Sequence, residues 1–103
     1  RDFCYIDDTV RAILQALNVP KVDGEVFNIA SGEPVSIREK IQKVCALTRA
    51  GNPKYGVVPY RPRENMALYA NISKAKQMLQ WEPAISLDKG LQKTSDCFVY
   101  EHD

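Results

Sequence analysis

Two arginine-containing clusters are the residues of this 103-residue chain that could bind an anionic ligand. Arg1 stands beside Asp2, and residues 61–64 read Arg-Pro-Arg-Glu in a loop after a predicted strand. Guanidinium groups form paired hydrogen bonds with phosphate, and Glu64 could accept hydrogen bonds from sugar hydroxyls. Pro62 would restrict the loop and so lower the entropy lost on binding. From the pattern alone, exposed charges in weak salt bridges are the more common explanation.

Several kinds of catalytic site are absent from the sequence. The five glycines lie at positions 24, 32, 51, 56 and 90, so there is neither a G-x-G dinucleotide turn nor a P-loop. No tyrosine is followed four residues later by lysine, which excludes a Tyr-x-x-x-Lys acid–base pair. The adjacent Asp7 and Asp8 are more typical of a helix start than of a catalytic dyad. We therefore expect neither catalytic nor cofactor-binding residues in this chain.

The cysteines and the histidine argue against a disulfide framework or a metal site. An odd number of cysteines (Cys4, Cys45 and Cys97) cannot pair completely within the chain, and the single histidine, His102, lies next to the end. Cys45 and Cys97 fall in apolar helical patterns, where a thiol behaves as a small hydrophobic group. We expect reduced, buried thiols, no metal and a cytoplasmic protein.

The composition is that of an ordinary globular protein, with 45% hydrophobic residues, 26% charged residues and a net charge of +1. A near-neutral chain lacks the basic surface on which nucleic-acid binding depends. No apolar run approaches the roughly 20 residues of a membrane-spanning helix. Neither nucleic acid nor membrane is therefore an expected partner.

Apolar periodicity predicts alternating strands and helices, in the order β-α-β-α-β-(β)-α-α of a mixed α/β fold. Strands are predicted at 3–6, 25–30 and 55–60, with a short extended piece at 68–72. So few short strands would leave open sheet edges, which predicts that a longer protein supplies the others. The first residue, Arg1, agrees with that expectation, since the methionines stand only at 66 and 78.

Four helices are predicted from their end signals. Asp7 and Asp8 would cap the first, which carries an apolar face made of Val10, Ile13, Leu14 and Leu17. A capping box of Ser36 and Glu39 opens the second, which would turn its apolar residues inward. Serines open the remaining two, at Ser73 and Ser86.

Several segments together resemble the extended short-chain dehydrogenase/reductases that modify nucleotide sugars, the NAD-dependent epimerase/dehydratase family. RDFCYIDD resembles that family's R-D-[FY]-x-[YH]-[VI]-x-D, VFNIASG its Y-N-[IL]-G-[ST]-G turn, PYRPRE its R-x-G-[DE] substrate loop and YANISKA its Y-A-D-x-S-K-A segment. LQWEP and SLDKGL resemble L-G-W-x-P and S-L-x-x-G-[LI]. In family order and at family spacing, these segments lie at residues 1–8, 26–32, 59–64, 69–75, 79–83 and 86–91.

The resemblance implies an α/β fold, namely the C-terminal part of a Rossmann-like extended short-chain dehydrogenase/reductase. Residues 1–32 would add a late strand, helix and strand to the nucleotide-binding sheet. Residues 33–103 would form the small, mixed α/β substrate-binding lobe. The dinucleotide turn and the Tyr-x-x-x-Lys pair would lie in an N-terminal part absent from this chain.

The resemblance also implies an enzyme as the parent protein: an NAD- or NADP-dependent epimerase, dehydratase or 4-keto reductase (an isomerase, lyase or oxidoreductase) acting on a nucleoside-diphosphate sugar. Family residues at the Arg1 and Arg61 positions contact the diphosphate, and the acid at the Glu64 position accepts ribose hydroxyls. Tyr60 and Arg63 complete the predicted substrate site. The chain alone would be inactive, and the parent would form a homodimer as family members often do. The alternative is a non-catalytic, regulatory or structural homologue of the same fold.

Three positions depart from the family pattern. Arg63 stands where the substrate loop usually has glycine, which predicts a different backbone path. Asn71 replaces aspartate and can still accept a cap-like hydrogen bond. Gln80 replaces a glycine at a helix C-terminus, at a cost of about 1 kcal/mol for a left-handed cap.

Overall fold

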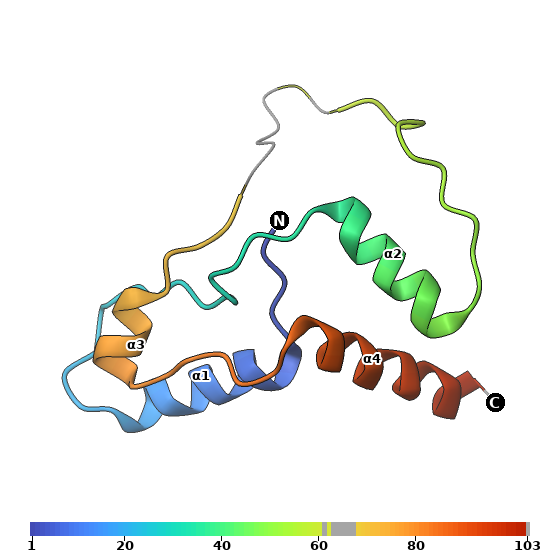
Figure 1. Cartoon of the computed structure of the whole chain (residues 1–103). Helices are drawn as coiled ribbons and strands as arrows, with labels where there is room; N and C mark the ends of the chain where they lie inside the picture. Colours follow the sequence, from blue (N-terminus) through green and yellow to red (C-terminus); the bar gives the residue numbers. More distant parts are fainter. Residues whose placement is uncertain (61, 63–67, 103) are drawn as a thin grey trace.

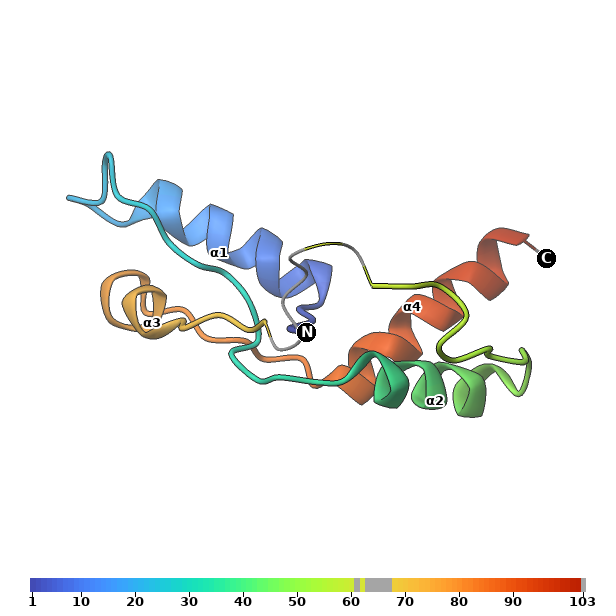
Figure 2. The same cartoon turned by 90° about the horizontal axis from the view of Figure 1, so that it is seen from above.

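The computed structural model describes residues 1–60, 62 and 68–102, which form four helices joined by long connections (Figure 1). The helices are α1 (Ile6–Asn18), α2 (Ile37–Thr48), α3 (Ser73–Leu79) and α4 (Leu87–His102). α1 packs against α3 and α2 against α4, and the first five residues run between the two pairs (Figure 1). The molecule is flat, with extents of 49 × 39 × 18 Å (Figure 2). None of the described helices is long and apolar enough to cross a membrane.

The serine caps predicted for two of the helices, α2 and α4, are confirmed. Ser36 Oγ accepts the N–H of Glu39 at 3.0 Å, and Ser86 Oγ accepts the N–H of Lys89 at 3.2 Å. Both serines therefore cap their helices. At α3, Ile72 occupies the cap position without a side-chain hydrogen bond, and the preceding Asn71 makes a cap-like contact, its Oδ1 accepting the N–H of Ser73 at 2.9 Å. The prediction for Asn71 is confirmed, whereas the prediction that Ser73 itself caps the helix is wrong.

α1 begins earlier than predicted, at Ile6, so Asp7 and Asp8 lie inside its first turn. Tyr5 occupies the cap position without a side-chain hydrogen bond. Asp8 reaches across to the segment before α4, where its carboxylate accepts the N–H groups of Ala84 and Ile85. The prediction that Asp8 caps its own helix is therefore wrong.

No strand forms among residues 1–60, 62 and 68–102, so these residues do not show the predicted α/β architecture. Residues 26–30 still show a strand's alternation, because Val26 and Asn28 are exposed while Phe27 and Ile29 pack against the core. A strand also requires a ladder of hydrogen bonds to a neighbouring strand. The described part of the chain supplies no such neighbour, and the segment remains extended but unpaired.

The core is small and lies around α1, α3 and the turn that follows α3. Its fully buried side chains include Leu79 and Trp81, with Ala12 from α1 and Ile72 and Ala75 from α3 and its cap. The apolar face predicted for α1 is outside this core: Val10, Ile13, Leu14 and Leu17 are 45%, 57%, 54% and 77% exposed. No residue of α2 is fully buried either, so the inward packing predicted for that helix is at most partial.

Candidate functional site

Arg1 is fixed through its backbone beside the segment that leads into α2. Its amino group donates to the carbonyl of Val35 at 2.8 Å, and the N–H of Val35 donates to the carbonyl of Arg1 at 2.7 Å. This reciprocal pair holds the first residue of the chain in the middle of the molecule (Figure 1). The backbone position from which the basic side chain of Arg1 extends is therefore fixed.

Asp2 connects Arg1 to two further segments. Its Oδ1 accepts the N–H of Ser31 at 2.7 Å and the Oγ–H of Ser31 at 2.5 Å. Its Oδ2 accepts the N–H groups of Gly32 at 2.9 Å and Ala70 at 3.2 Å. Partial burial opposes ionisation of Asp2, but the hydrogen bonds from Ser31, Ala70 and Gly32 outweigh it and lower the pKa of the carboxyl group.

These contacts form one side of an open hollow of about 370 Å³. Arg1 and Asp2 line it together with Asn28, Leu68, Tyr69 and Ala70. A guanidinium, an amide and a phenol can together bind phosphate oxygens and sugar hydroxyls. Asn28 and Tyr69 are therefore candidate ligand-binding residues that the sequence reasoning missed. Their signal was their place within the family-like segments VFNIASG and YANISKA.

Of the other predicted site residues, Tyr60 is the one that the structure describes. Tyr60 is 74% exposed and is not among the described residues that line the hollow. Arg61, Arg63 and Glu64 lie outside the described residues. The substrate site around Arg61 and Glu64 stays a prediction.

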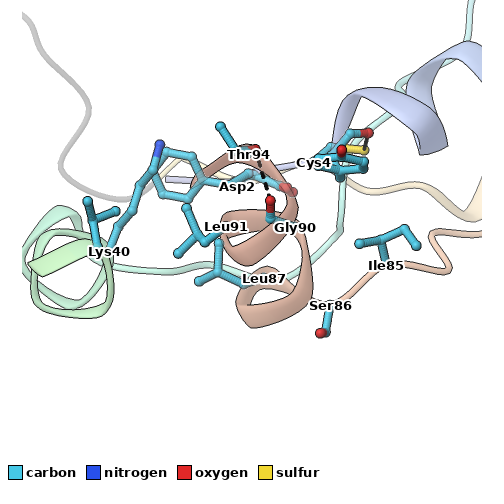
Figure 3. A pocket seen from close by; sticks show the side chains of 12 residues that line it. Asp2, Cys4, Lys40, Ile85, Ser86, Leu87, Gly90, Leu91 and Thr94 are labelled. Carbon is cyan, nitrogen blue, oxygen red and sulfur yellow. Dashed lines mark hydrogen bonds between the residues drawn. The ribbon is translucent and has the colours of Figure 1, made fainter. Parts of the chain in front are cut away.

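A larger hollow of about 530 Å³ lies between the N-terminal segment, α2 and α4 (Figure 3). Its lining is mostly apolar, and the charge of Lys40 lies 3.8 Å from the centre of the Phe3 ring. A Cβ at Gly90 would lie 3.2 Å from Cδ1 of Tyr5, so a larger residue there would require the Tyr5 ring to shift by a few tenths of an ångström. The polar side chains of this hollow include those of Asp2, Lys40, Ser86 and Thr94, and of the predicted site residues that the structure describes, neither Arg1 nor Tyr60 lines it.

The thiols and the acidic side chains form no further site in the part of the chain that the structure describes. None of the three cysteines forms a disulfide bond; Cys4 and Cys45 are partly buried, whereas Cys97 is exposed, so the predicted burial is wrong for Cys97. Desolvation raises the pKa of the Cys4 thiol, which disfavours the reactive thiolate. Among the described residues, no group of histidine, cysteine, aspartate and glutamate could hold a metal ion.

The sequence matches a known family over nearly its whole length. The model of the family described as GDP-mannose 4,6 dehydratase matches residues 1–94. This chain belongs to that family. It is 35% identical over 95 residues to a UDP-glucuronate 4-epimerase of Thermodesulfobacterium geofontis, covering 91% of this chain and 28% of the relative. The resemblance to the epimerase/dehydratase family is thereby confirmed.

Solved structures of family members resemble the whole chain. A UDP-glucose 4-epimerase of Thermotoga maritima, determined with UDP-glucose, is 34% identical and covers 100% of this chain with a TM-score of 0.88. A variant UDP-glucuronic acid 4-epimerase of Bacillus cereus, determined with a fluorinated UDP-sugar and NAD, is 35% identical and covers 99% with a TM-score of 0.85. The chain spans 32% of the length of each of these two proteins.

The residues of this family member do not fit a dinucleotide cofactor by themselves. A dinucleotide turn requires closely spaced glycines that let the backbone approach the pyrophosphate. Gly24, Gly32, Gly51 and Gly56 have positive φ angles, but each stands alone in its own turn. No chemical step is therefore assigned to a cofactor held by this chain.

Proposed function

We propose that this chain is the nucleotide-sugar-binding part of a longer NAD(P)-dependent epimerase, dehydratase or 4-keto reductase. The observation that carries the proposal is the likeness over the whole chain to the Thermotoga maritima epimerase determined with UDP-glucose. Residues outside this chain would hold the cofactor and exchange the proton, and nicotinamide would supply the hydride chemistry. The role of this chain is binding energy and orientation.

Within that enzyme, residues 1–32 contribute a strand, a helix and a strand to the nucleotide-binding sheet, and residues 33–103 form the substrate lobe. Two observations support this division. Residues 26–30 alternate in burial as a strand would but lack a paired neighbour. α1 leaves four large apolar side chains of one face exposed, which is the pattern of a helix that covers a sheet. Pairing with strands from the remainder of the enzyme completes the α/β fold.

The hollow beside Arg1 receives the diphosphate. Arg1 and Arg61 bind its oxygens, and Glu64 accepts hydrogen bonds from the ribose hydroxyls. Asn28 and Tyr69 add neutral donors and acceptors along the same wall. Bidentate contacts of arginine with phosphate are charge-assisted, so each supplies more binding energy than a neutral hydrogen bond.

The test is Arg61→Ala in the longer protein, assayed with the UDP-sugar that the wild type converts. KM should rise at least about tenfold, because a charge-assisted contact contributes about 1.5–3 kcal/mol. The matched control is Arg49→Ala, because Arg49 is an exposed arginine at the end of α2. Unchanged kinetics in Arg61→Ala would contradict the role of Arg61. A wild type that binds UDP-sugars without converting any of them would instead be the non-catalytic homologue.

A further inference from the structure

We propose that Asp2 is a positioning residue for substrate binding: its carboxylate holds Arg1 against residues 68–70 and so fixes the guanidinium for the diphosphate. This inference rests on the proposed function and deepens it. Asp2 touches no substrate in this account. It acts through the backbone of Arg1 and through the opposite wall of the hollow.

The first support is the number and origin of the hydrogen bonds that Asp2 accepts. Both oxygens accept two bonds each, and the donors come from Ser31, Gly32 and Ala70. These partners lie 29, 30 and 68 residues along the chain from Asp2. The Asp2 carboxylate therefore joins the N-terminal segment to residues 31–32 and to Ala70, and it is the side-chain acceptor in all four of these hydrogen bonds.

The second support is where these segments lie. Arg1 and Asp2 form one side of the 370 Å³ hollow, and Leu68, Tyr69 and Ala70 form another. The Ala70 bond sets the distance between the two sides, while the reciprocal pair with Val35 anchors Arg1. Losing the Asp2 carboxylate would free the second wall from the first without removing any group to which the proposed function assigns ligand binding.

The third support is electrostatic. A carboxylate next to a diphosphate site would repel the ligand if its charge were free. Three N–H groups and one hydroxyl donate to Asp2, which disperses that charge and leaves neither oxygen free of a donor. The same four donors suit an ionised carboxylate and not an amide, because an amide NH₂ placed there would face donors.

The experiment is Asp2→Asn in the longer protein, measured by calorimetric titration with UDP, CDP, GDP and dTDP. For whichever of these the wild type binds most tightly, Kd should rise about tenfold, since hydrogen bonds to a charged group are lost. NADH affinity should stay within about twofold, because no residue of this chain fits a dinucleotide turn. An unchanged nucleotide Kd in Asp2→Asn overturns the inference.

Asp8→Asn is the matched control for loss of stability alone. Asp8 also accepts backbone N–H groups from a distant segment, but it does not line the hollow beside Arg1. The Asp8→Asn substitution should lower Tm and leave the nucleotide Kd within about twofold, since the contacts of Asp8 lie away from the hollow. A rise in Kd for Asp8→Asn as large as that for Asp2→Asn would overturn the inference, because destabilisation would then explain both.

A double-mutant cycle with Arg1→Ala separates positioning from an independent contribution. If Asp2 acts through Arg1, adding Asp2→Asn to Arg1→Ala should change Kd by less than about twofold. If the fold-changes in Kd caused by Asp2→Asn and Arg1→Ala instead multiplied in the double variant, the inference would be overturned and the proposed function would stand. If Arg1→Ala itself leaves Kd unchanged, both the role of Arg1 in the proposed function and the inference fail.

Ser31 provides a second route if Asp2→Asn does not fold. Ser31→Ala removes one of the four hydrogen bonds and should raise Kd about threefold in the wild type but not in the Arg1→Ala background. Ser31→Thr keeps the hydroxyl and should restore Kd to near the wild-type value. A Kd for Ser31→Ala equal to that of the wild type would overturn the inference.

Discussion

Asp8 is 2% exposed, yet it is an ionisable side chain, and its surroundings explain why it can be buried. Its carboxylate accepts from Arg11 Nη2 at 3.0 Å and from the N–H groups of Ala84 at 3.1 Å and Ile85 at 3.0 Å. Desolvation opposes its ionisation, but the bonds from Ile85, Ala84 and Arg11 outweigh it and lower the pKa of Asp8. Its carbonyl oxygen accepts the buried indole N–H of Trp81 at 2.9 Å.

Replacing Asp8 should therefore be costly. Asp8→Asn removes the charge and leaves at least one buried N–H group facing an amide donor, so the free energy of unfolding should fall by about 2 kcal/mol. Chemical denaturation of the purified protein measures the change. Asp7→Asn is the matched control, because Asp7 is the adjacent, exposed aspartate, and it should change the free energy by at most about 0.5 kcal/mol. Equal effects of the two substitutions would contradict the account of Asp8.

At the residue scale, the sequence predicted the type of several groups but not their partners. It identified Arg1 as a candidate for anion binding and Asn71 as a cap acceptor. It could not assign Asp2 or Asp8 to the N–H groups that they bind, because those groups lie 29 to 77 residues away. A carboxylate near a helix start carries the same local signal whether it caps that helix or binds a distant loop.

At the scale of elements, helix ends were largely predictable because their signals are local. Ser36, Ser86 and Asn71 accept N–H groups within three residues of themselves. The strands were not predictable as strands, because a ladder depends on a neighbour that local sequence does not specify. Residues 26–30 kept the alternation of a strand without the pairing.

Gln80 offers a test at the end of α3. It adopts a left-handed conformation, with φ 53° and ψ 37°, at the position where the family pattern has glycine. Because a side chain is disfavoured there, Gln80→Gly should raise the free energy of unfolding by about 1 kcal/mol, as measured by chemical denaturation. The matched control is Gln77→Gly, since Gln77 is an exposed residue inside the same helix, and it should lower stability by about 1 kcal/mol. If Gln80→Gly also lowered the free energy of unfolding, the cost of the left-handed conformation at Gln80 would be excluded as the explanation.

At the scale of the whole molecule, the exposed face of α1 is the feature that the small core does not explain. Ala12 is the apolar side chain that α1 buries completely, while Ile13, Leu14 and Leu17 remain more than half exposed. If this face covers a sheet in the longer enzyme, Leu14→Lys should lower its free energy of unfolding by about 2 kcal/mol or more, because a charge would be buried without a partner. Thermal or chemical denaturation measures the loss.

The control for that prediction is Gln42→Lys, at an exposed polar position of α2. It should change stability by less than about 0.5 kcal/mol. A neutral Leu14→Lys in the longer enzyme would mean that the α1 face stays in solvent there. The division into residues 1–32 and 33–103 would then lose its main support.

By itself, the sequence determined the four helices, the serine caps of two of them and the family, because capping, helical periodicity and motif order each depend on residues that lie close together in the chain. Only the tertiary structure decided that Asp2 joins Ser31, Gly32 and Ala70, that Asp8 holds the segment before α4, and that Asn28 and Tyr69 share a hollow with Arg1. It also decided which face of α1 is buried. Those outcomes depend on which distant segments meet, and that is fixed by packing and by the need of each buried donor and acceptor for a partner.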